Sequence, residues 1–201
     1  GFFDYNIDNS KIDSISADQA TTKFSVLQTI IVEEMNNTGI TTSQRDSNLV
    51  SRLTTAIAGR RIAIENAEDL YNFSMIVSYN WSKSQNVLNE PHYQTIQLML
   101  NQHYILVDDI NYSSYVAKRF NPIGIDLDLP DDVNDRLLPF TGTFDGQGFT
   151  ISNLYLSDYN YITMVHKLDA EGENLQDFPL IESYSMFSNV GVTGIVKNFT
   201  L

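Results

Sequence analysis

The stretch Pro139-Phe-Thr-Gly-Thr-Phe-Asp-Gly-Gln-Gly-Phe-Thr-Ile-Ser-Asn-Leu-Tyr-Leu156 carries most of the information about the fold. Residues 141–144 are rich in β-formers and predict a short strand. The next four residues, 145–148, predict a turn, because glycine adopts positive φ without a steric clash and aspartate accepts hydrogen bonds from its own downstream backbone. A second strand is expected over residues 149–156, and Asn153 marks a corner because the alternation of apolar residues breaks there.

The same pattern returns 45 residues later in the chain, where Val196-Lys-Asn-Phe-Thr-Leu201 matches Ile151-Ser-Asn-Leu-Tyr-Leu156. A recurring asparagine between apolar residues is typical of a parallel β-solenoid, in which like residues of successive coils stack and an asparagine ladder satisfies the polar groups at the corner. Residues 157–183 include an acidic, glycine-bearing segment and are expected to form an insertion between coils.

Residues 140–154 resemble the opening coil of a family of bacterial surface proteins with the pattern F-x-G-x-F-D-G-x-G, followed by GLUG-type repeats. Residues 186–201 are similar to the next element of that family, and the resemblance extends over about residues 61–201. It implies a right-handed parallel β-helix, found in adhesins, surface-anchored proteins and non-catalytic parts of immunoglobulin A protease-like enzymes. The residues that carry the motif are Phe140, Gly142, Phe144, Asp145, Gly146, Gly148, Ile151, Asn153, Leu154, Gly194 and Asn198.

The first hundred residues predict helices instead, because apolar residues recur there at three- and four-residue steps. Helices are expected after Ser16 to about Met35, over residues 47–58, after a cap at Asn66, and after Pro91. Short strands are expected at 61–64 and 103–107.

The predicted fold class is therefore mainly β with a helical N-terminal part, namely the first coils of a right-handed parallel β-helix capped by α-helices. The predicted organisation has three parts. These are a helical region of unknown kin (1–60), a helix-strand cap (61–120) and β-helix coils with an insertion at about 157–183 (121–201).

Composition excludes several classes of protein. The chain has 201 residues, 12 Lys+Arg against 25 Asp+Glu, a net charge of −13 and no cysteine. Clustered positive charge is needed to bind nucleic acid or anionic lipid, so neither is an expected partner. Disulfides and cysteine metal sites are excluded, and no apolar run is long enough to insert into a membrane.

The acidic run between residues 126 and 135 is a candidate calcium loop, because calcium prefers several carboxylate oxygens on a flexible loop. A solvated acidic loop is the favoured alternative, and no other cofactor is expected. The candidate ligands are Asp126, Asp128, Asp131, Asp132 and Asp135.

A second candidate site is the aromatic cluster Tyr155, Tyr159 and Tyr161, which could stack on sugar rings of a host glycan. Hydrophobic cover for the fold is the favoured alternative. The histidines His92, His103 and His166 lie far apart in sequence and are interpreted as surface or packing residues.

No catalytic constellation is visible in the sequence: His-Glu-x-x-His, Gly-x-Ser-x-Gly and a phosphate-binding loop are all missing. We therefore expect a non-catalytic structural or adhesive module of an extracellular or cell-surface protein, assembling through its open β-helix end. The expected partners are further β-helix coils, a second copy of the chain in a filament, or a host glycan or protein.

The alternative is a fragment of a β-helix polysaccharide-active enzyme or protease whose catalytic residues lie outside this chain. In a lyase of that kind, Arg136 or Lys118 could serve as the base beside calcium.

Overall fold

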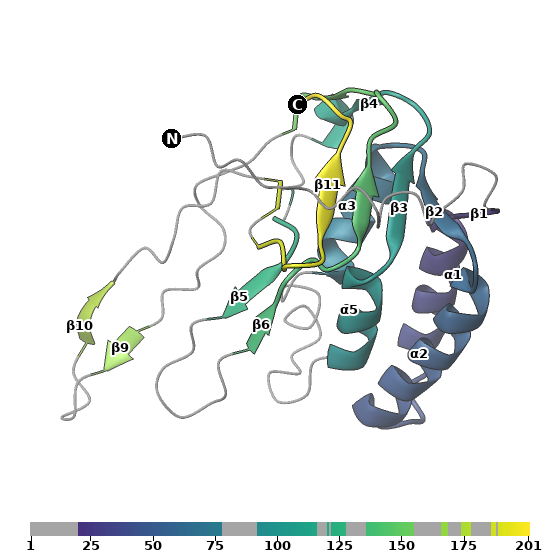
Figure 1. The fold of residues 1–201 in the computed structure, drawn as a ribbon. Helices are drawn as coiled ribbons and strands as arrows, with labels where there is room; N and C mark the ends of the chain where they lie inside the picture. The colour runs from purple at the N-terminus through teal and green to yellow at the C-terminus, as the bar shows by residue number, and fades with distance from the viewer. Residues whose placement is uncertain are drawn as a thin grey trace.

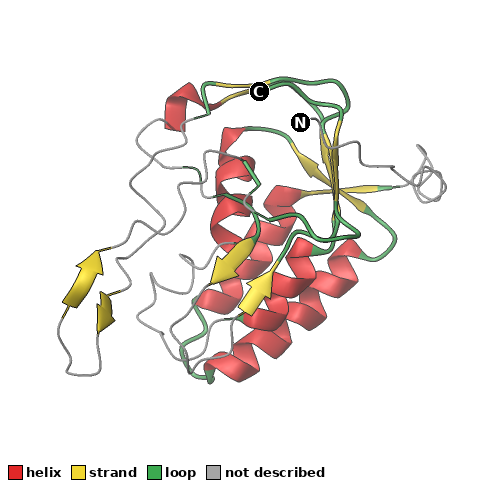
Figure 2. Cartoon of the chain, turned by 60° about the vertical axis from the view of Figure 1, so that its left-hand side comes forward, coloured by secondary structure: helices red, strands yellow, loops and turns green. Residues whose placement is uncertain are grey.

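A five-stranded parallel sheet with helices on one face forms the centre of the molecule, as the computed structural model shows (Figures 1 and 2). The structure describes residues 20–77, 92–115, 120, 122–127, 136–154, 166–168, 174–177, 186–187 and 189–201. In chain order the elements are β1 (Thr21–Lys23), α1 (Phe24–Met35), α2 (Thr42–Ile57), β2 (Arg61–Ile64), α3 (Ala67–Ile76), α5 (Tyr93–Leu100), β3 (His103–Leu106), β4 (Ile110–Asn111), the 3-10 helix η2 (Tyr112–Tyr115), β5 (Ile125–Leu127), β6 (Arg136–Leu138), β7 (Thr143–Asp145), β8 (Ile151–Ser152), β9 (His166–Leu168), β10 (Asn174–Asp177) and β11 (Ile195–Lys197).

The strands of the main sheet follow one another in chain order, β1-β2-β3-β7-β11, and every neighbouring pair is parallel. Three smaller pairs accompany it: β4 with β8 in parallel, and β5 with β6 and β9 with β10 in antiparallel orientation. The β9–β10 pair lies in the stretch that the sequence marked as an insertion.

The predicted fold class is wrong. Helix-capped coils of a β-helix were expected, but the described residues form a parallel sheet whose apolar face is covered by α1, α2, α3 and α5 (Figure 2). The helices are not a separate cap. Helices α1 and α2 connect β1 to β2, and α3 and α5 lie between β2 and β3, so each is part of the connection that parallel neighbours require.

The 45-residue match on which the solenoid prediction depended is not the register of the sheet. Val196 pairs with Phe144 in the main sheet, whereas Ile151 pairs with Ile110 in a different one. The two similar segments therefore occupy different positions, and their likeness reflects a shared strand-then-corner conformation.

Most of the predicted helices and strands in the first half of the chain are confirmed. The strand at 61–64 is β2, and the Asn66 side chain accepts a hydrogen bond from the Asp69 N–H at the start of α3. Helix α2 begins earlier than expected because Thr41 and Gln44 form a reciprocal capping box. The expected start of the first helix near Ser16 lies outside the described residues, and residues 21–23 form β1 in place of helix.

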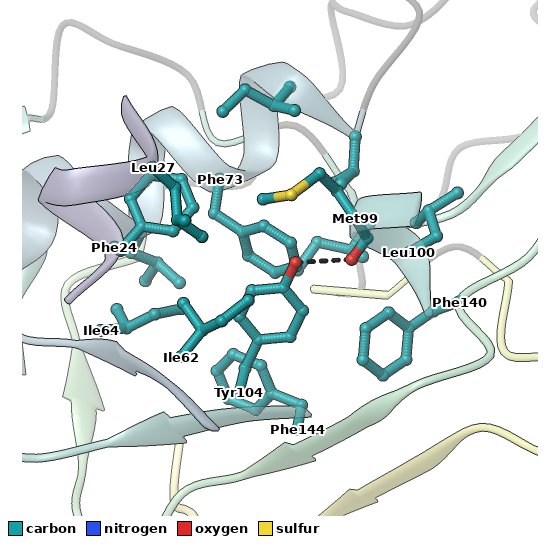
Figure 3. Packing of buried hydrophobic residues seen from close by; sticks show 14 of the residues in the cluster. Phe24, Leu27, Ile62, Ile64, Phe73, Met99, Leu100, Tyr104, Phe140 and Phe144 are labelled. Carbon is teal, nitrogen blue, oxygen red and sulfur yellow. Dashed lines mark hydrogen bonds between the residues drawn. The ribbon is translucent and has the colours of Figure 1, made fainter. Parts of the chain in front are cut away.

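Large apolar side chains fill the space between the sheet and the helices (Figure 3). The Phe73 and Tyr104 rings lie 4.2 Å apart between centroids, and both side chains are fully buried. The Tyr104 hydroxyl donates to the Met99 carbonyl, so its one polar group is satisfied in the core. The sheet is therefore fixed on one face, and its two lateral edges are left to the strands β1 and β11.

Candidate functional site at the open sheet edge

Within the described part of the chain, one side of the β11 backbone has no partner. The Ile195 N–H donates to the Gly142 carbonyl over 2.9 Å, and the Gly146 N–H donates to the Lys197 carbonyl over 2.9 Å. Because alternate residues of a strand direct their N–H and C=O groups to opposite sides, those of Val196 point away from β7. No group in the described part of the chain bonds them, and Figure 1 shows β11 at the outer edge of the sheet.

The C-terminal layer, defined here as residues 189–201, is also apolar at its surface. It makes further parallel bridges to the preceding layer through Val190 with Phe140 and Thr200 with Thr150. Val190 and Leu201 are 43% and 62% exposed, and Val192 is fully exposed. These three are half of the large hydrophobic residues that are exposed in the described chain, so apolar exposure is concentrated in this layer.

The Asp145 turn attaches the C-terminal layer to the sheet. The Asp145 carboxylate accepts hydrogen bonds from the Gln147 N–H at 3.0 Å and the Asn198 side-chain amide at 3.1 Å, and the Lys197 ammonium lies 3.4 Å away. Burial by itself raises the pKa of Asp145, but these hydrogen bonds and the Lys197 charge outweigh it, so the pKa is lowered. The carboxylate therefore joins the turn to the C-terminal layer through Asn198 and Lys197.

The glycines of this motif have separate functions. A Cβ on Gly146 would lie 2.1 Å from Cβ of Phe199 and 2.6 Å from the Asn198 carbonyl oxygen, so only glycine lets the C-terminal layer approach. Gly148 has a φ of 85°, which glycine adopts without strain, and its N–H donates to the Asn198 carbonyl over 2.7 Å.

The two asparagines mark corners but do not form one ladder. Asn153 and Asn198 have left-handed φ values of 57° and 59°, which asparagine tolerates better than most residues. The Asn153 amide donates to Asn111 Oδ1 over 2.9 Å, and the Asn198 amide donates to Asp145. Both side chains are exposed and bond side-chain oxygens of other residues, whereas the sequence predicted that the two asparagines stack in one ladder.

The remaining motif residues lie in and around the same region. Phe140, Phe144 and Ile151 are buried in the core, Leu154 packs against it, and the Gly194 N–H donates to the Gly191 carbonyl in the C-terminal layer. The motif therefore holds strands together. Sequence reasoning assigned no function to Val196 and Lys197, although it placed both in the repeated segment 196–201, and the β-branched Ile195 and Val196 are a strand signal.

The predicted ligand sites are largely outside the described residues. This holds for Tyr155, Tyr159 and Tyr161 and for all members of the acidic run except Asp126, which lies in β5 and pairs with Leu137. No group of three or more metal-ligating side chains occurs within the described ranges. The structure thus leaves the calcium and glycan predictions untested.

A pocket of about 310 Å³ lies where the C-terminal ends of α2 and α5 meet the start of β3. Its titratable lining residues are Arg60 and His103, accompanied by Thr54, Asn101 and Gln102. Burial and the nearby Arg61 charge lower the pKa of His103, and the Lys197 charge acts in the same direction against the Asp145 carboxylate. Among the described residues, no carboxylate lines this pocket.

The opposite edge, β1, is built differently. It consists of the polar residues Thr21, Thr22 and Lys23. Lys23 forms a 3.0 Å ion pair with Glu65, the residue that follows β2. The Arg60 guanidinium donates to the Thr21 carbonyl over 3.3 Å. This arrangement protects the edge from further pairing.

Among the helices that the structure describes, none is both long and apolar enough to cross a membrane. The chain matches no family model, and no solved structure matches it significantly. A stretch of 106 residues, 50% of the chain, is 32% identical to Halomucin of Haloquadratum walsbyi. The chain spans about 1% of the length of Halomucin, so the similarity concerns a small part of that protein.

Proposed function

We propose that the chain is a non-catalytic structural or adhesive module of an extracellular or cell-surface protein, and that its β11 edge binds a further parallel strand. The observation that carries this proposal is the pair of unbonded Val196 backbone groups on an apolar layer. An exposed strand edge is a template for pairing, and native proteins normally protect it. The chain protects β1 and leaves β11 open, which supports a binding function for β11.

The surface location has independent support. The match to Halomucin is compatible with a module at the cell surface, since its name places that relative among mucin-like proteins. A chain with a net charge of −13 and no cysteine would stay soluble and keep its fold without disulfides. Protease treatment of intact source cells should cleave this chain while a cytoplasmic marker stays whole, and full protection of the chain would contradict the location.

The absence of catalysis is part of the proposal. The most motif-like carboxylate, Asp145, is already bonded by Gln147, Asn198 and Lys197. The described pocket joins a cation and a histidine of lowered pKa without a carboxylate. Neither arrangement places an unengaged carboxylate beside a second proton donor or acceptor, and such a pairing is what hydrolysis of a polysaccharide commonly uses.

The edge can be tested with a peptide of residues 139–148, which contains the strand that pairs with β11 in the fold. We expect the peptide to slow hydrogen exchange at the Val196 amide and to shift its NMR signal. Val196→Pro removes that outward N–H while the bonds from β11 to β7 remain, because they involve Ile195 and Lys197.

The variant should keep the wild-type unfolding midpoint within a few degrees. Because proline has no amide signal of its own, binding to the variant is followed at the Lys197 amide, and the peptide-induced shift seen there in the wild type should be lost. Thr200→Pro is not a suitable control, because the Thr200 N–H donates to the Phe149 carbonyl. If neither the wild-type Val196 signal nor its exchange rate responds to a strand peptide, the edge has no binding function and the proposal fails.

A further inference from the structure

The sheet contains rows of side chains that continue from strand to strand, and these rows end at β11. One row faces the helices and consists of Ile62, Tyr104, Phe144 and Val196. The next row on the other face places Ala63, Ile105, Asp145 and Lys197 side by side. A strand bound at the β11 edge would extend both rows by one residue each.

We infer that the strand accepted by β11 carries an acidic residue beside Lys197, an apolar residue beside Val196 and a glycine two residues before the apolar one. This inference rests on the proposed function and adds the chemistry of the partner. The expected sequence of the bound strand is Gly-x-apolar-acidic. The strand would run parallel to β11, as all neighbouring strands of the main sheet do.

The acidic position follows from charge. The Lys197 ammonium lies 3.4 Å from Asp145 on one side, and its side chain is 27% exposed. No other described residue is placed beside it on the open side of β11. Opposite charges in neighbouring positions of a sheet are favourable and like charges are unfavourable, so the open side favours a carboxylate.

The apolar position follows from the core. Phe144 packs edge-to-face with Phe187 and Phe199, at centroid distances of 5.4 and 5.5 Å, and Val196 packs partly buried against the same cluster. An apolar side chain beside Val196 would extend this core and bury surface that is now exposed.

The glycine follows from the backbone. Strands β7 and β11 are each preceded directly by a glycine, Gly142 and Gly194. A Cβ on these residues would lie 2.0 Å from the Gln102 carbonyl oxygen and 2.3 Å from the Phe140 carbonyl oxygen, respectively. The last two strands to join the sheet thus need glycine where the chain crosses the preceding layer, and we expect the same of the next.

A second copy of this chain fits the edge poorly. Its free strand is β1, and matching the rows would put Lys23 beside Lys197 and Thr22 beside Val196. Ala20 would then occupy the glycine position. The charge, the apolar row and the close approach all disfavour β1-to-β11 stacking of copies.

The chain contains a sequence that meets the pattern, Gly142-Thr-Phe-Asp145, in β7. A peptide of residues 139–148 is therefore the matching probe, and three relatives are matched controls. These controls are the same peptide with Asp145→Lys, the same peptide with Gly142→Ala, and a peptide of residues 18–27 that contains β1.

The experiment is a calorimetric titration of each peptide into the whole chain, followed at the Val196 and Lys197 amides by NMR. We expect the Asp145→Lys peptide to bind about tenfold more weakly than its parent, and the β1 peptide to be at least as weak. In a Lys197→Glu chain the preference between the Asp and Lys peptides should reverse, and in Lys197→Gln it should disappear.

The outcomes separate the two proposals. If the peptides bind at Val196 with equal affinity in the wild-type and Lys197→Glu chains, the charge specificity is wrong while strand binding stands. If the β1 peptide binds best, the occupant is a second copy and this inference is overturned. If no peptide affects Val196, the proposed function itself fails. Circular dichroism of each variant checks that a lost preference does not come from unfolding.

Discussion

The two edges of the sheet, β1 and β11, are made of opposite chemistry. At β1 the outward Thr21 carbonyl receives the Arg60 guanidinium, and Lys23 pairs with Glu65. At β11 the Val196 N–H and C=O have no partner in the described chain, and Val190 and Val192 are exposed nearby. The difference is between an edge whose outward carbonyl is bonded and an edge whose outward groups have no partner in the described chain, and it is the basis of the binding proposed for β11.

The comparison also shows how each edge is attached to the core. Strand β1 continues directly into α1, whose first residue, Phe24, is fully buried and lies edge-on to Phe73. Strand β11 is held by its pairing with β7, by the Asp145 turn and by aromatic contacts of Phe144. We therefore expect the β11 end to be more sensitive to changes at the layer boundary.

The largest expected effect is that of Phe144→Ala. Its side chain is fully buried and contacts rings of the C-terminal layer, so the substitution should lower the free energy of unfolding by about 4 kcal/mol. Chemical denaturation measures this loss. Hydrogen exchange should accelerate more at Ile195 and Lys197 than at β1, and uniform acceleration would show that the two ends are equally coupled. Val26→Ala, at a 47% exposed site, is the matched control and should change little.

Much of the local structure could be predicted from the sequence because it is set by local signals. The Asn66 cap identifies a helix start, and the β-forming residues at 103–106 identify a strand, without long-range information. The fold class could not be predicted in the same way. Apolar faces of helices indicate that they are buried, but they do not say whether they cover an end of a coil or a whole sheet face.

The site was predictable only in part, for a related reason. The glycines and Asp145 are visible in the sequence because turn geometry restricts residue type. Which strand lies beside Val196 depends on register across 52 residues between Phe144 and Val196, and no local signal encodes that distance. The repeated Asn153 and Asn198 suggested a spacing of 45 residues because each follows a strand at a left-handed corner.

The next largest effect is the loss of stability when glycine is replaced, and it should differ between Gly146, which follows β7, and Gly59, which precedes β2. Gly146→Ala should cost about 3 kcal/mol of unfolding free energy, since its Cβ would meet Phe199 and Asn198 within van der Waals distance. Gly59, just before β2, has a φ of 66° but nothing within 4 Å of its missing Cβ, so Gly59→Ala should cost about 1 kcal/mol of backbone strain alone. Thermal denaturation of both variants decides this, and equal losses would remove the argument from close approach.

A smaller effect is expected from Asp145→Asn, which keeps the shape but removes the charge beside Lys197. The loss should be about 2 kcal/mol near neutral pH. Because the folded-state pKa of Asp145 is lowered, its contribution is present above the pKa of the unfolded chain and is lost as pH falls through the folded pKa. Unfolding followed from pH 7 down to pH 2 should therefore converge for wild type and variant at the acid end. A constant difference across that range would show that the carboxylate charge is not what matters.

His103, at the start of the central strand β3, should make a smaller contribution to the pH dependence of stability. Both of its ring nitrogens are buried and have no hydrogen-bond partner among the described residues. Burial and the charges of Arg61 and Lys197 lower its pKa, although the Asp145 charge acts in the opposite direction. Stability from the neutral ring is complete above the ordinary histidine pKa, about 6.5, and is lost as pH falls through the folded value. His103→Leu should lose less stability than wild type between pH 7.5 and pH 5. His92 is unchanged in both chains, so the difference reports on His103, and identical pH profiles would contradict the prediction.

The smallest effect on stability is expected at the β1 edge. Lys23→Gln removes an ion pair whose two side chains are 63% and 34% exposed, so the free energy of unfolding should change by less than about 0.5 kcal/mol. Lys197→Gln is the matched change at the open edge and should cost more, because its partner Asp145 is buried. Sedimentation of both variants extends the test, since the Arg60 contact to Thr21 remains in Lys23→Gln and should keep β1 closed. If Lys23→Gln promoted self-association and Lys197→Gln did not, β1 would be the edge poised for pairing, and the contrast between the two edges would be inverted.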